Sequence, residues 1–253
     1  GVEVVRGDLE DLESLTRAAK AADGVIHTAF IHDFSQFAKS CAVDRKVIEV
    51  LGAALEGSAR PLLVTGGVGH LASGRPATEV DHPPAPSAAF PRASEAAAAD
   101  VAARGVKVGV VRLPIIHGAG DHGFLPILIA LAQEKGASAY IGAGQNHWAA
   151  AHRKDAARVY RLALEAGVPA PVYHAIAEEG LTLKAIAEII GRRLNVPVVA
   201  RTGDEVTAHF GWFAPFAGME AFASSARTRT LLNWHPDQPG LMADLEQAGY
   251  FPA

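Results

Sequence analysis

The sequence lacks the features that mark several large classes of protein. Its only cysteine, Cys41, cannot form an internal disulfide, which fits a reducing compartment such as the cytoplasm. The N-terminal residues show neither the basic region nor the apolar run of a signal peptide. Apolar stretches stay far below the roughly 18 residues of a membrane span, and the best of them, residues 124–132, contains Pro126. We therefore expect a cytoplasmic protein that does not enter a membrane.

Neither positive nor negative charge is in large excess. Lys and Arg total 23 and Asp and Glu total 27, so the formal net charge is −4, without long runs of either sign. A surface of this kind does not attract nucleic acid or an anionic membrane. We expect a small molecule as the partner instead.

Apolar residues, in contrast, are plentiful. They make up 49% of the 253 residues, and a chain of this length can bury roughly three quarters of the surface that its unfolded form exposes. The length predicts one large domain, or a core domain with a smaller partner. The first residue is Gly1 and not Met, so we expect further residues before it.

Strand-like and helical patterns alternate through the first two thirds of the chain. The runs that predict strands are residues 2–5, 24–27, 61–65, 106–113 and 172–176, and the helical patterns cover about 12–19, 34–55, 87–104 and 155–165. The run 106–113 is apolar nearly throughout, which indicates burial on both faces, as in a parallel sheet covered by helices. The alternation predicts an α/β fold with a Rossmann-like, doubly wound parallel sheet.

The pattern changes after residue 177. An amphipathic helix is predicted by the spacing of Leu183, Ile186, Ile190 and Leu194, and residues 210–222 are rich in aromatic side chains. These features predict a second, smaller region that packs over the ligand crevice of the sheet.

Two glycine-rich segments resemble parts of a dinucleotide fingerprint. Residues 67–72 match G-x-G-x-x-A directly after a strand, but the proline-rich residues that follow predict no helix to hold a pyrophosphate. Residues 118–123 precede a helix that starts near Phe124, yet Asp121 would place a negative charge beside the phosphates. We interpret the second segment as a substrate loop.

Four stretches, taken in order, resemble a known family: residues 5–11, 23–30, 111–118 and 152–157. Their order and spacing are similar to those of an atypical branch of the extended short-chain dehydrogenase/reductases, the NAD-dependent epimerase/dehydratase family. The resemblance covers nearly the whole chain. It implies that a strand, a helix and a strand precede Gly1 and carry the family's glycine-rich phosphate loop.

The resemblance also implies a cofactor, NAD or NADP. It assigns residues 1–177 to a dinucleotide-binding domain and residues 178–253 to a smaller substrate-capping region. Asp8 and Leu9 would border the adenine, and Ala29 and Phe30 the ribose and pyrophosphate. Leu113 and Pro114 would also contact the cofactor. From its sequence position alone, Asp8 is equally a cap for the helix that follows it.

The family's catalytic Tyr and the Lys four residues later are missing. Pro91 stands at the Tyr position and Glu95 at the Lys position, and a prolyl ring cannot donate a proton. The family's usual serine or threonine is partly represented by Thr65. By resemblance, Thr65, Ser94 and Glu95 are the candidates that would replace the usual proton donors.

Asp44 is a catalytic candidate on physical grounds. It falls on the apolar stripe of the predicted helix 34–55, so its carboxylate should face the sheet and needs a partner. By resemblance it occupies the position of an asparagine in the active-site hydrogen-bond network. The alternative is a buried carboxylate held by backbone amides.

Histidines are many, and His117, His122, His147 and His152 are predicted on loops that could converge. Neither His-x4-His pair lies in a predicted helix, and no cysteine cluster accompanies them, so we expect no metal. By family analogy His117, His152 and Trp148 would line the substrate pocket.

Two classes of function remain open. The first is an NAD(P)-dependent oxidoreductase or epimerase-like enzyme on a small polar substrate, sugar-like or carbonyl, without the usual Tyr and Lys. The second is a dinucleotide-binding sensor or scaffold without catalysis. The resemblance also implies a possible homodimer, and on balance we favour the enzyme.

Overall fold

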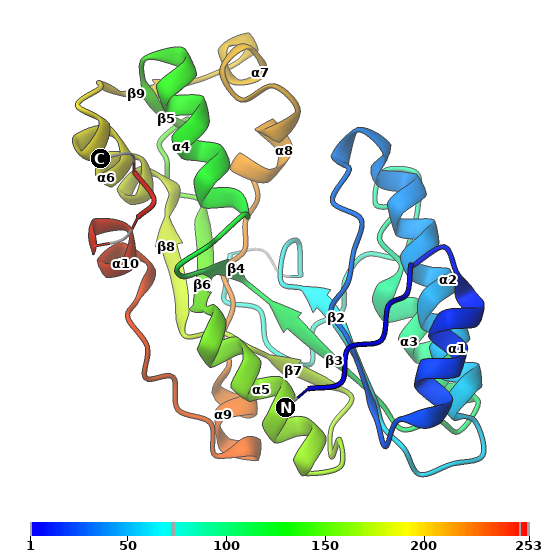
Figure 1. The fold of residues 1–253 in the computed structure, drawn as a ribbon. Helices are drawn as coiled ribbons and strands as arrows, with labels where there is room; N and C mark the ends of the chain where they lie inside the picture. The colour runs from blue at the N-terminus through cyan, green and yellow to red at the C-terminus, as the bar shows by residue number, and fades with distance from the viewer. Residues whose placement is uncertain (1, 72–73, 248, 252–253) are drawn as a thin grey trace. The chain divides into compact units, whose positions relative to one another are not determined.

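The computed structural model describes residues 2–71, 74–247 and 249–251 (Figure 1). The chain folds into two compact units: the first holds residues 1–66, 83–112 and 159–173, and the second holds 67–82, 113–158 and 174–253. The chain therefore passes between the units more often than the single expected boundary at 177 allows. The cofactor-binding and capping roles expected for 1–177 and 178–253 stay predictions.

The first unit is built on a four-stranded sheet. Its strands follow the order β1 (Val25–His27), β2 (Leu62–Gly67), β3 (Val108–Leu113) and β7 (Val172–His174). Strands β1 and β2 run parallel, with Val25 opposite Leu62. The interior of β3 is buried, as its apolar run predicts. Parallel strands joined by helices confirm the expected α/β class.

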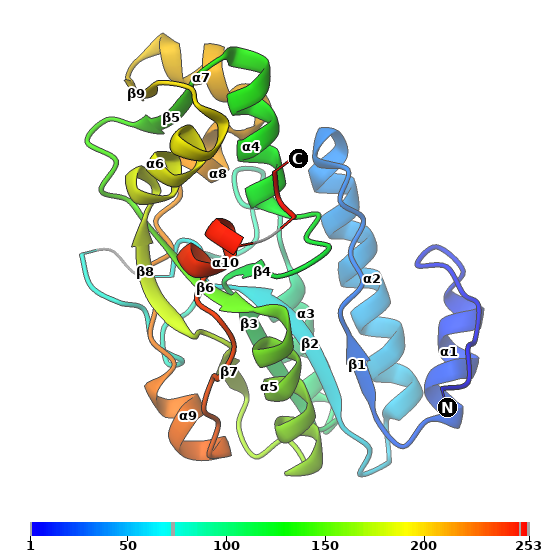
Figure 2. The same ribbon diagram turned by 60° about the vertical axis from the view of Figure 1, so that its left-hand side comes forward.

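Three helices accompany this sheet: α1 (Leu12–Ala21), α2 (Phe37–Leu55) and α3 (Ser94–Ala103), with a short 3-10 turn η1 (Phe34–Gln36) before α2. Figure 2 shows α2 between α1 and α3, and α2 packs against both. The core joins Ile48 and Leu51 of α2 to Leu62 of β2 and Val101 of α3. Burying such side chains stabilises the unit by roughly 1.5–3 kcal/mol each.

Three expectations for the first unit are wrong. Residues 2–5 form no strand, and Val2, Val4 and Val5 are exposed, because no described strand runs beside them to pair their backbone. The helix expected from residue 87 begins only at Ser94, after a stretch with prolines at 83, 84, 86 and 91. Asp11, and not Asp8, caps α1 by accepting from the backbone N–H of Ser14.

The second unit contains two small sheets. One has the order β4 (Ile115–His117), β6 (His147–His152) and β8 (Glu178–Thr182), and the other pairs β5 (Ser138–Ile141) with β9 (Val198–Arg201). The helical elements are α4 (Phe124–Lys135), α6 (Leu183–Leu194), α7 (Asp204–Phe210), η2 (Gly211–Phe213), α8 (Ala214–Ala217), α9 (Ala226–Leu232) and α10 (Leu241–Gln247). Helix α5 (Arg153–Glu165) runs from residues of this unit into residues of the first.

The core of the second unit is aromatic and aliphatic. Trp148 is fully buried and packs beside Phe124 and Phe213. The predicted amphipathic helix is confirmed as α6, whose N-cap Thr182 accepts from the backbone N–H of Ala185. None of the helices in the described residues has the length and apolar character to cross a membrane.

Candidate active site

Asp44 is the centre of a buried hydrogen-bond network in the first unit. One oxygen, Oδ1, lies 2.9 Å from Nε2 of His27, the last residue of β1. The other, Oδ2, accepts a 2.5 Å bond from the hydroxyl of Ser94, the first residue of α3. The expectation that Asp44 needs a partner is confirmed, and the partners are side chains and not backbone amides.

Ser94 extends the network to Arg92. The Arg92 Nε–H donates to Ser94 Oγ over 3.2 Å, while the Ser94 proton points to Asp44. The Arg92 guanidinium also lies over the ring of Phe30, with 4.8 Å between its central carbon and the ring centre. The network therefore orients Ser94 and Arg92 together.

Thr65 belongs to a second hydrogen-bonded group. Its hydroxyl donates to the backbone oxygen of His27 over 2.7 Å, so it accepts, over 2.8 Å, the proton of the Tyr160 phenol. Burial raises the pKa of Tyr160 to about 12, against smaller lowering effects of Thr65 and Arg92. At neutral pH the phenol keeps its proton and holds Thr65 in place.

Glu95 is engaged by a buried cation. Nε and Nη2 of Arg112 donate to its two carboxylate oxygens, each over 2.8 Å, and the Arg112 side chain is fully buried. A Cβ on Gly66 would lie 2.9 Å from Glu95 Oε1, so glycine leaves room for this pair. Glu95 is thus a fixed anion, unlike the cation that the family places there.

The residues expected to bind the cofactor differ in their exposure, and their role stays a prediction. Asp8 is exposed, and its Oδ1 accepts a hydrogen bond from the backbone N–H of Glu10. Ala29 is exposed and Phe30 partly exposed, both beyond the carboxyl end of β1, where ligands of parallel sheets bind. Leu9 is partly buried, as are Leu113 at the end of β3 and Pro114 after it.

Neither glycine-rich segment is built as a phosphate loop. No helix follows residues 67–71 among the described residues 74–86, and a Cβ on Gly69 would lie 2.3 Å from Met219 Sδ. The N-terminus of α4 is preceded by Asp121, whose Oδ1 accepts from the N–H of Gly123 over 2.6 Å. A phosphate at that helix end would meet this carboxylate.

The expected substrate residues lie in the second unit. Nδ1 of His117 is 2.9 Å from Asp244 Oδ2, and its buried Nε2 has no partner among the described residues. The rings of His117 and His152 are 5.5 Å apart. Burial lowers the pKa of His152, and nearby His117 acts in the same direction. Trp148, by contrast, lies in the apolar core.

The expectation that these histidines lie on loops is wrong for three of them. His117 ends β4, and His147 and His152 begin and end β6. The pairing of β6 with β8 is irregular between Trp148 and Ala150, so simple alternation along the strand does not relate these two histidines. Within the described part of the chain, no group of three or more His, Cys, Asp or Glu side chains is arranged to hold a metal ion.

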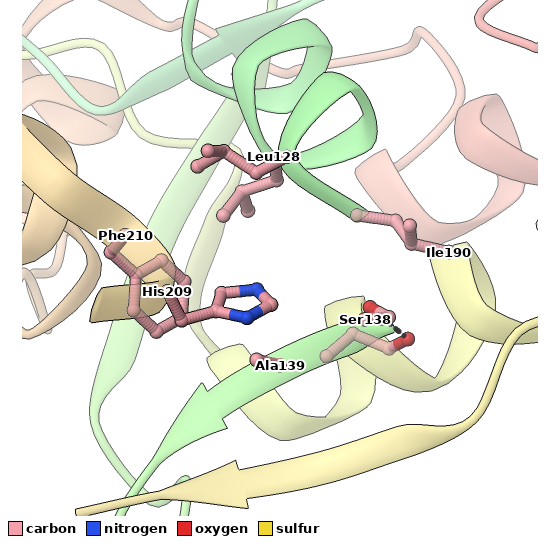
Figure 3. Close-up of a pocket in the computed structure, with 8 residues that line it drawn as sticks. Leu128, Ser138, Ala139, Ile190, His209 and Phe210 are labelled. Atoms are coloured by element: carbon pink, nitrogen blue, oxygen red, sulfur yellow. Dashed lines mark hydrogen bonds between the residues drawn. The ribbon is translucent and has the colours of Figure 1, made fainter. Parts of the chain in front are cut away.

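A small pocket between α4, α6, α7 and β5 was not expected. Its cavity volume is about 10 Å³, room for roughly one water molecule, so it is far too small for a dinucleotide. Figure 3 shows the imidazole of His209 directed into it, near Ser138 and Ala139. Burial lowers the pKa of His209, and Arg201 and Lys135 add to the effect.

Four members of the site were missed by the sequence reasoning: His27, Arg92, Arg112 and Tyr160. His27 stood in a stretch used for the resemblance, and a histidine at the buried end of a short strand was the one available signal. Tyr160 meets Thr65 across 95 positions of sequence, a pairing that only the fold creates.

Comparison with known proteins agrees with this architecture. The sequence model of the NAD dependent epimerase/dehydratase family matches residues 1–176. The chain is 45% identical to "Uncharacterized protein C2A9.02" of Schizosaccharomyces pombe, over 97% of this chain and 83% of that protein. It is 41% identical to "Uncharacterized protein YLL056C" of Saccharomyces cerevisiae, over 96% and 82%.

Solved structures show the same fold. The dTDP-glucose 4,6-dehydratase DesIV of Streptomyces venezuelae, with NAD bound, superposes with a TM-score of 0.74 at 18% identity, over 96% of this chain and 77% of that one. The UDP-glucose 4-epimerase of Thermus thermophilus, in complex with NAD, gives 0.72 at 18% identity, over 97% and 83%. The predicted Rossmann-like fold is confirmed, and the prediction of a nicotinamide cofactor agrees with the family.

Proposed function

Because the chain belongs to the NAD dependent epimerase/dehydratase family, we propose that it is an NAD(P)-dependent oxidoreductase or epimerase-like enzyme. Its substrate is a small polar molecule, sugar-like or carbonyl, and its chemistry proceeds without the family's Tyr and Lys. The observation that carries the proposal is the network of His27, Asp44 and Ser94. It lies where β1 ends and α3 begins, the edge of a parallel sheet at which ligands bind.

The network supplies a route for one proton. Ser94 already donates to Asp44 over 2.5 Å, while its bond from Arg92 is longer, at 3.2 Å. A substrate hydroxyl that donated to the second lone pair of Ser94 Oγ would give its proton to this oxygen as the Ser94 proton moves to Asp44, while Arg92 keeps its own bond to Ser94. His27 holds the second oxygen of Asp44 and keeps the carboxyl oriented. A bound nicotinamide dinucleotide supplies the hydride acceptor or donor for such chemistry.

Asp44→Asn tests this route, because it keeps the shape of the side chain and removes the base. We expect unchanged NADH affinity by calorimetry and a kcat at least 10²-fold lower, the usual contribution of a general base. Turnover of a panel of sugar nucleotides, aldehydes and ketones is followed by NADH or NADPH absorbance and by chromatography of the products, because an epimerase returns the hydride and leaves the cofactor unchanged. Asp100→Asn, on the exposed face of α3, is the matched control and should behave as wild type. Equal kcat in both variants would remove Asp44 from the chemistry.

A specific observation favours the second candidate, a dinucleotide-binding sensor or scaffold without catalysis. Glu95 is locked to Arg112, and Pro91 takes the place of the family's Tyr, so two positions of the usual machinery cannot move a proton. In that case wild type would bind NADH and turn over no member of the panel. Light scattering of the same samples tests the expected homodimer.

A further inference from the structure

Arg92 is fixed in place but its terminal nitrogens are not used. Ser94 accepts from Nε, and the guanidinium lies over the ring of Phe30. The side chain of residue 92 is partly buried. Among the described residues, no acceptor contacts Nη1 or Nη2, and no carboxylate forms an ion pair with Arg92.

The surrounding charges explain why this cation is still unneutralised. The nearby carboxylate of Asp44 is occupied on both oxygens by His27 and Ser94. Glu95, three residues along, gives both oxygens to Arg112. Burial raises the pKa of the Cys41 thiol and of the Tyr160 phenol, and the nearby positive charge of Arg92 partly lowers both values. Arg92 therefore lies close to the buried residues of this site, Ser94 and Tyr160 among them.

When Nε of an arginine is already bonded, its two terminal nitrogens can still donate two parallel hydrogen bonds to one bidentate acceptor. That geometry matches a carboxylate or a phosphate, which accept two parallel N–H bonds. A cation–π contact with an aromatic ring restrains the guanidinium without using its donors. The arrangement of Phe30, Arg92 and Ser94 is therefore prepared for an oxyanion that arrives from outside the chain.

We propose that Arg92 binds a carboxylate or phosphate group of the substrate, so that the substrate is an anionic hydroxy or carbonyl compound. The inference rests on the proposed function and narrows its substrate class. Arg92 donates to Ser94, the residue at which the proton transfer is placed, which favours the substrate as the source of the oxyanion. The other source with the same chemistry is a phosphate of the dinucleotide.

Titration calorimetry on the whole chain tests the proposal. The probes are malonate, inorganic phosphate and NADH, each at constant ionic strength, with wild type, Arg92→Met and Arg161→Met. Arg161 is the matched control, an exposed arginine of the same unit that pairs with Glu165. We expect malonate or phosphate to bind wild type and Arg161→Met equally, and Arg92→Met at least tenfold more weakly. NADH affinity should be the same in all three proteins.

Other results overturn the proposal in distinguishable ways. If Arg92→Met weakens NADH as much as malonate and phosphate, the oxyanion belongs to the dinucleotide. If wild type binds neither malonate nor phosphate, or if Arg92→Met binds them unchanged, Arg92 holds no oxyanion. If NADH fails to bind wild type, the proposed function fails, while the two anions still report on Arg92. Arg92→Lys keeps the charge and loses the fork, so it should show a several-fold loss even if Arg92→Met does not fold.

Discussion

At the scale of single residues, Asp44 serves both the fold and the proposed chemistry, so its removal should lower the free energy of unfolding. Asp44→Ala would leave the buried imidazole of His27 and hydroxyl of Ser94 without their acceptor. Unsatisfied buried groups of this kind cost about 1–3 kcal/mol each. We expect a loss of about 3 kcal/mol in the free energy of unfolding, measured by urea denaturation.

Asp100→Ala provides the comparison for this measurement. Asp100 pairs with Arg45 at the surface, where such ion pairs contribute about 0–1 kcal/mol. A change at Asp44 as small as that at Asp100 would mean that water or neighbouring side chains replace the carboxylate without cost. The network would then be incidental to the fold.

The residue scale also shows what the sequence could predict about the site. The position of Asp44 on an apolar stripe predicts burial, which the structure confirms. Its partners could not be predicted, because His27 and Ser94 lie 17 and 50 positions away. Nothing local in the sequence indicates that Arg112 is buried or that it takes both oxygens of Glu95.

At the scale of elements, the packing of α2 on α3 depends on Gly52. A Cβ at this position would lie 2.4 Å from Cγ1 of Val101 on α3, a stiff β-branched side chain. In an isolated helix, Gly→Ala adds up to about 1 kcal/mol of stability. Here we expect Gly52→Ala to lower the free energy of unfolding by about 1–3 kcal/mol, the cost of overpacking.

A double-mutant cycle identifies the contact responsible for that loss. Val101→Ala removes the two methyl groups that the new Cβ would meet, so Gly52→Ala should cost less in that background, with a coupling energy of at least about 0.5 kcal/mol. Additive effects of the two substitutions in urea denaturation would show that contact with Val101 does not cause the loss of stability in Gly52→Ala.

The elements that were predicted wrongly share a physical cause. The run at residues 2–5 has the β-branched residues of a strand, but strand formation needs a partner, and no described strand lies beside it. The alanine-rich pattern from residue 87 favours a helix, yet Pro91 delays its start to Ser94. Strands such as β3 were predictable because their burial on both faces gives a continuous apolar run.

At the scale of the whole molecule, the alternation of patterns was enough to predict a parallel α/β fold, and the division of the chain was not. Residues 67–82 and 113–158 belong with the C-terminal part, far from it in sequence. Composition changes after residue 177, but the division follows the packing of aromatic and aliphatic side chains, such as Trp148 with Phe213. That packing brings together segments that are distant in the sequence, and no local sequence pattern predicts that they belong to one unit.

Two buried histidines should make the stability of the protein depend on pH. Burial lowers the pKa of His152 and of His209 below the ordinary value of 6.5, so both imidazoles resist protonation in the folded chain. His152 faces His117, Lys154, Asp155 and Asp244, and His209 faces Lys135, Arg201 and Glu134. Below the ordinary value the unfolded chain binds more protons than the folded one, so stability falls as the pH falls.

We therefore expect a lower urea midpoint at about pH 5.5 than at about pH 7.5, a range above the titration of ordinary carboxylates. The double substitution His152→Gln and His209→Gln should reduce this difference, since glutamine does not titrate. His235→Gln, at an exposed position, should leave the difference as in wild type. If the difference in urea midpoint remains after the double substitution, other groups take up the protons on unfolding. If the midpoint of wild type is higher at about pH 5.5 than at about pH 7.5, the pKa values of the two histidines are not lowered in the folded chain.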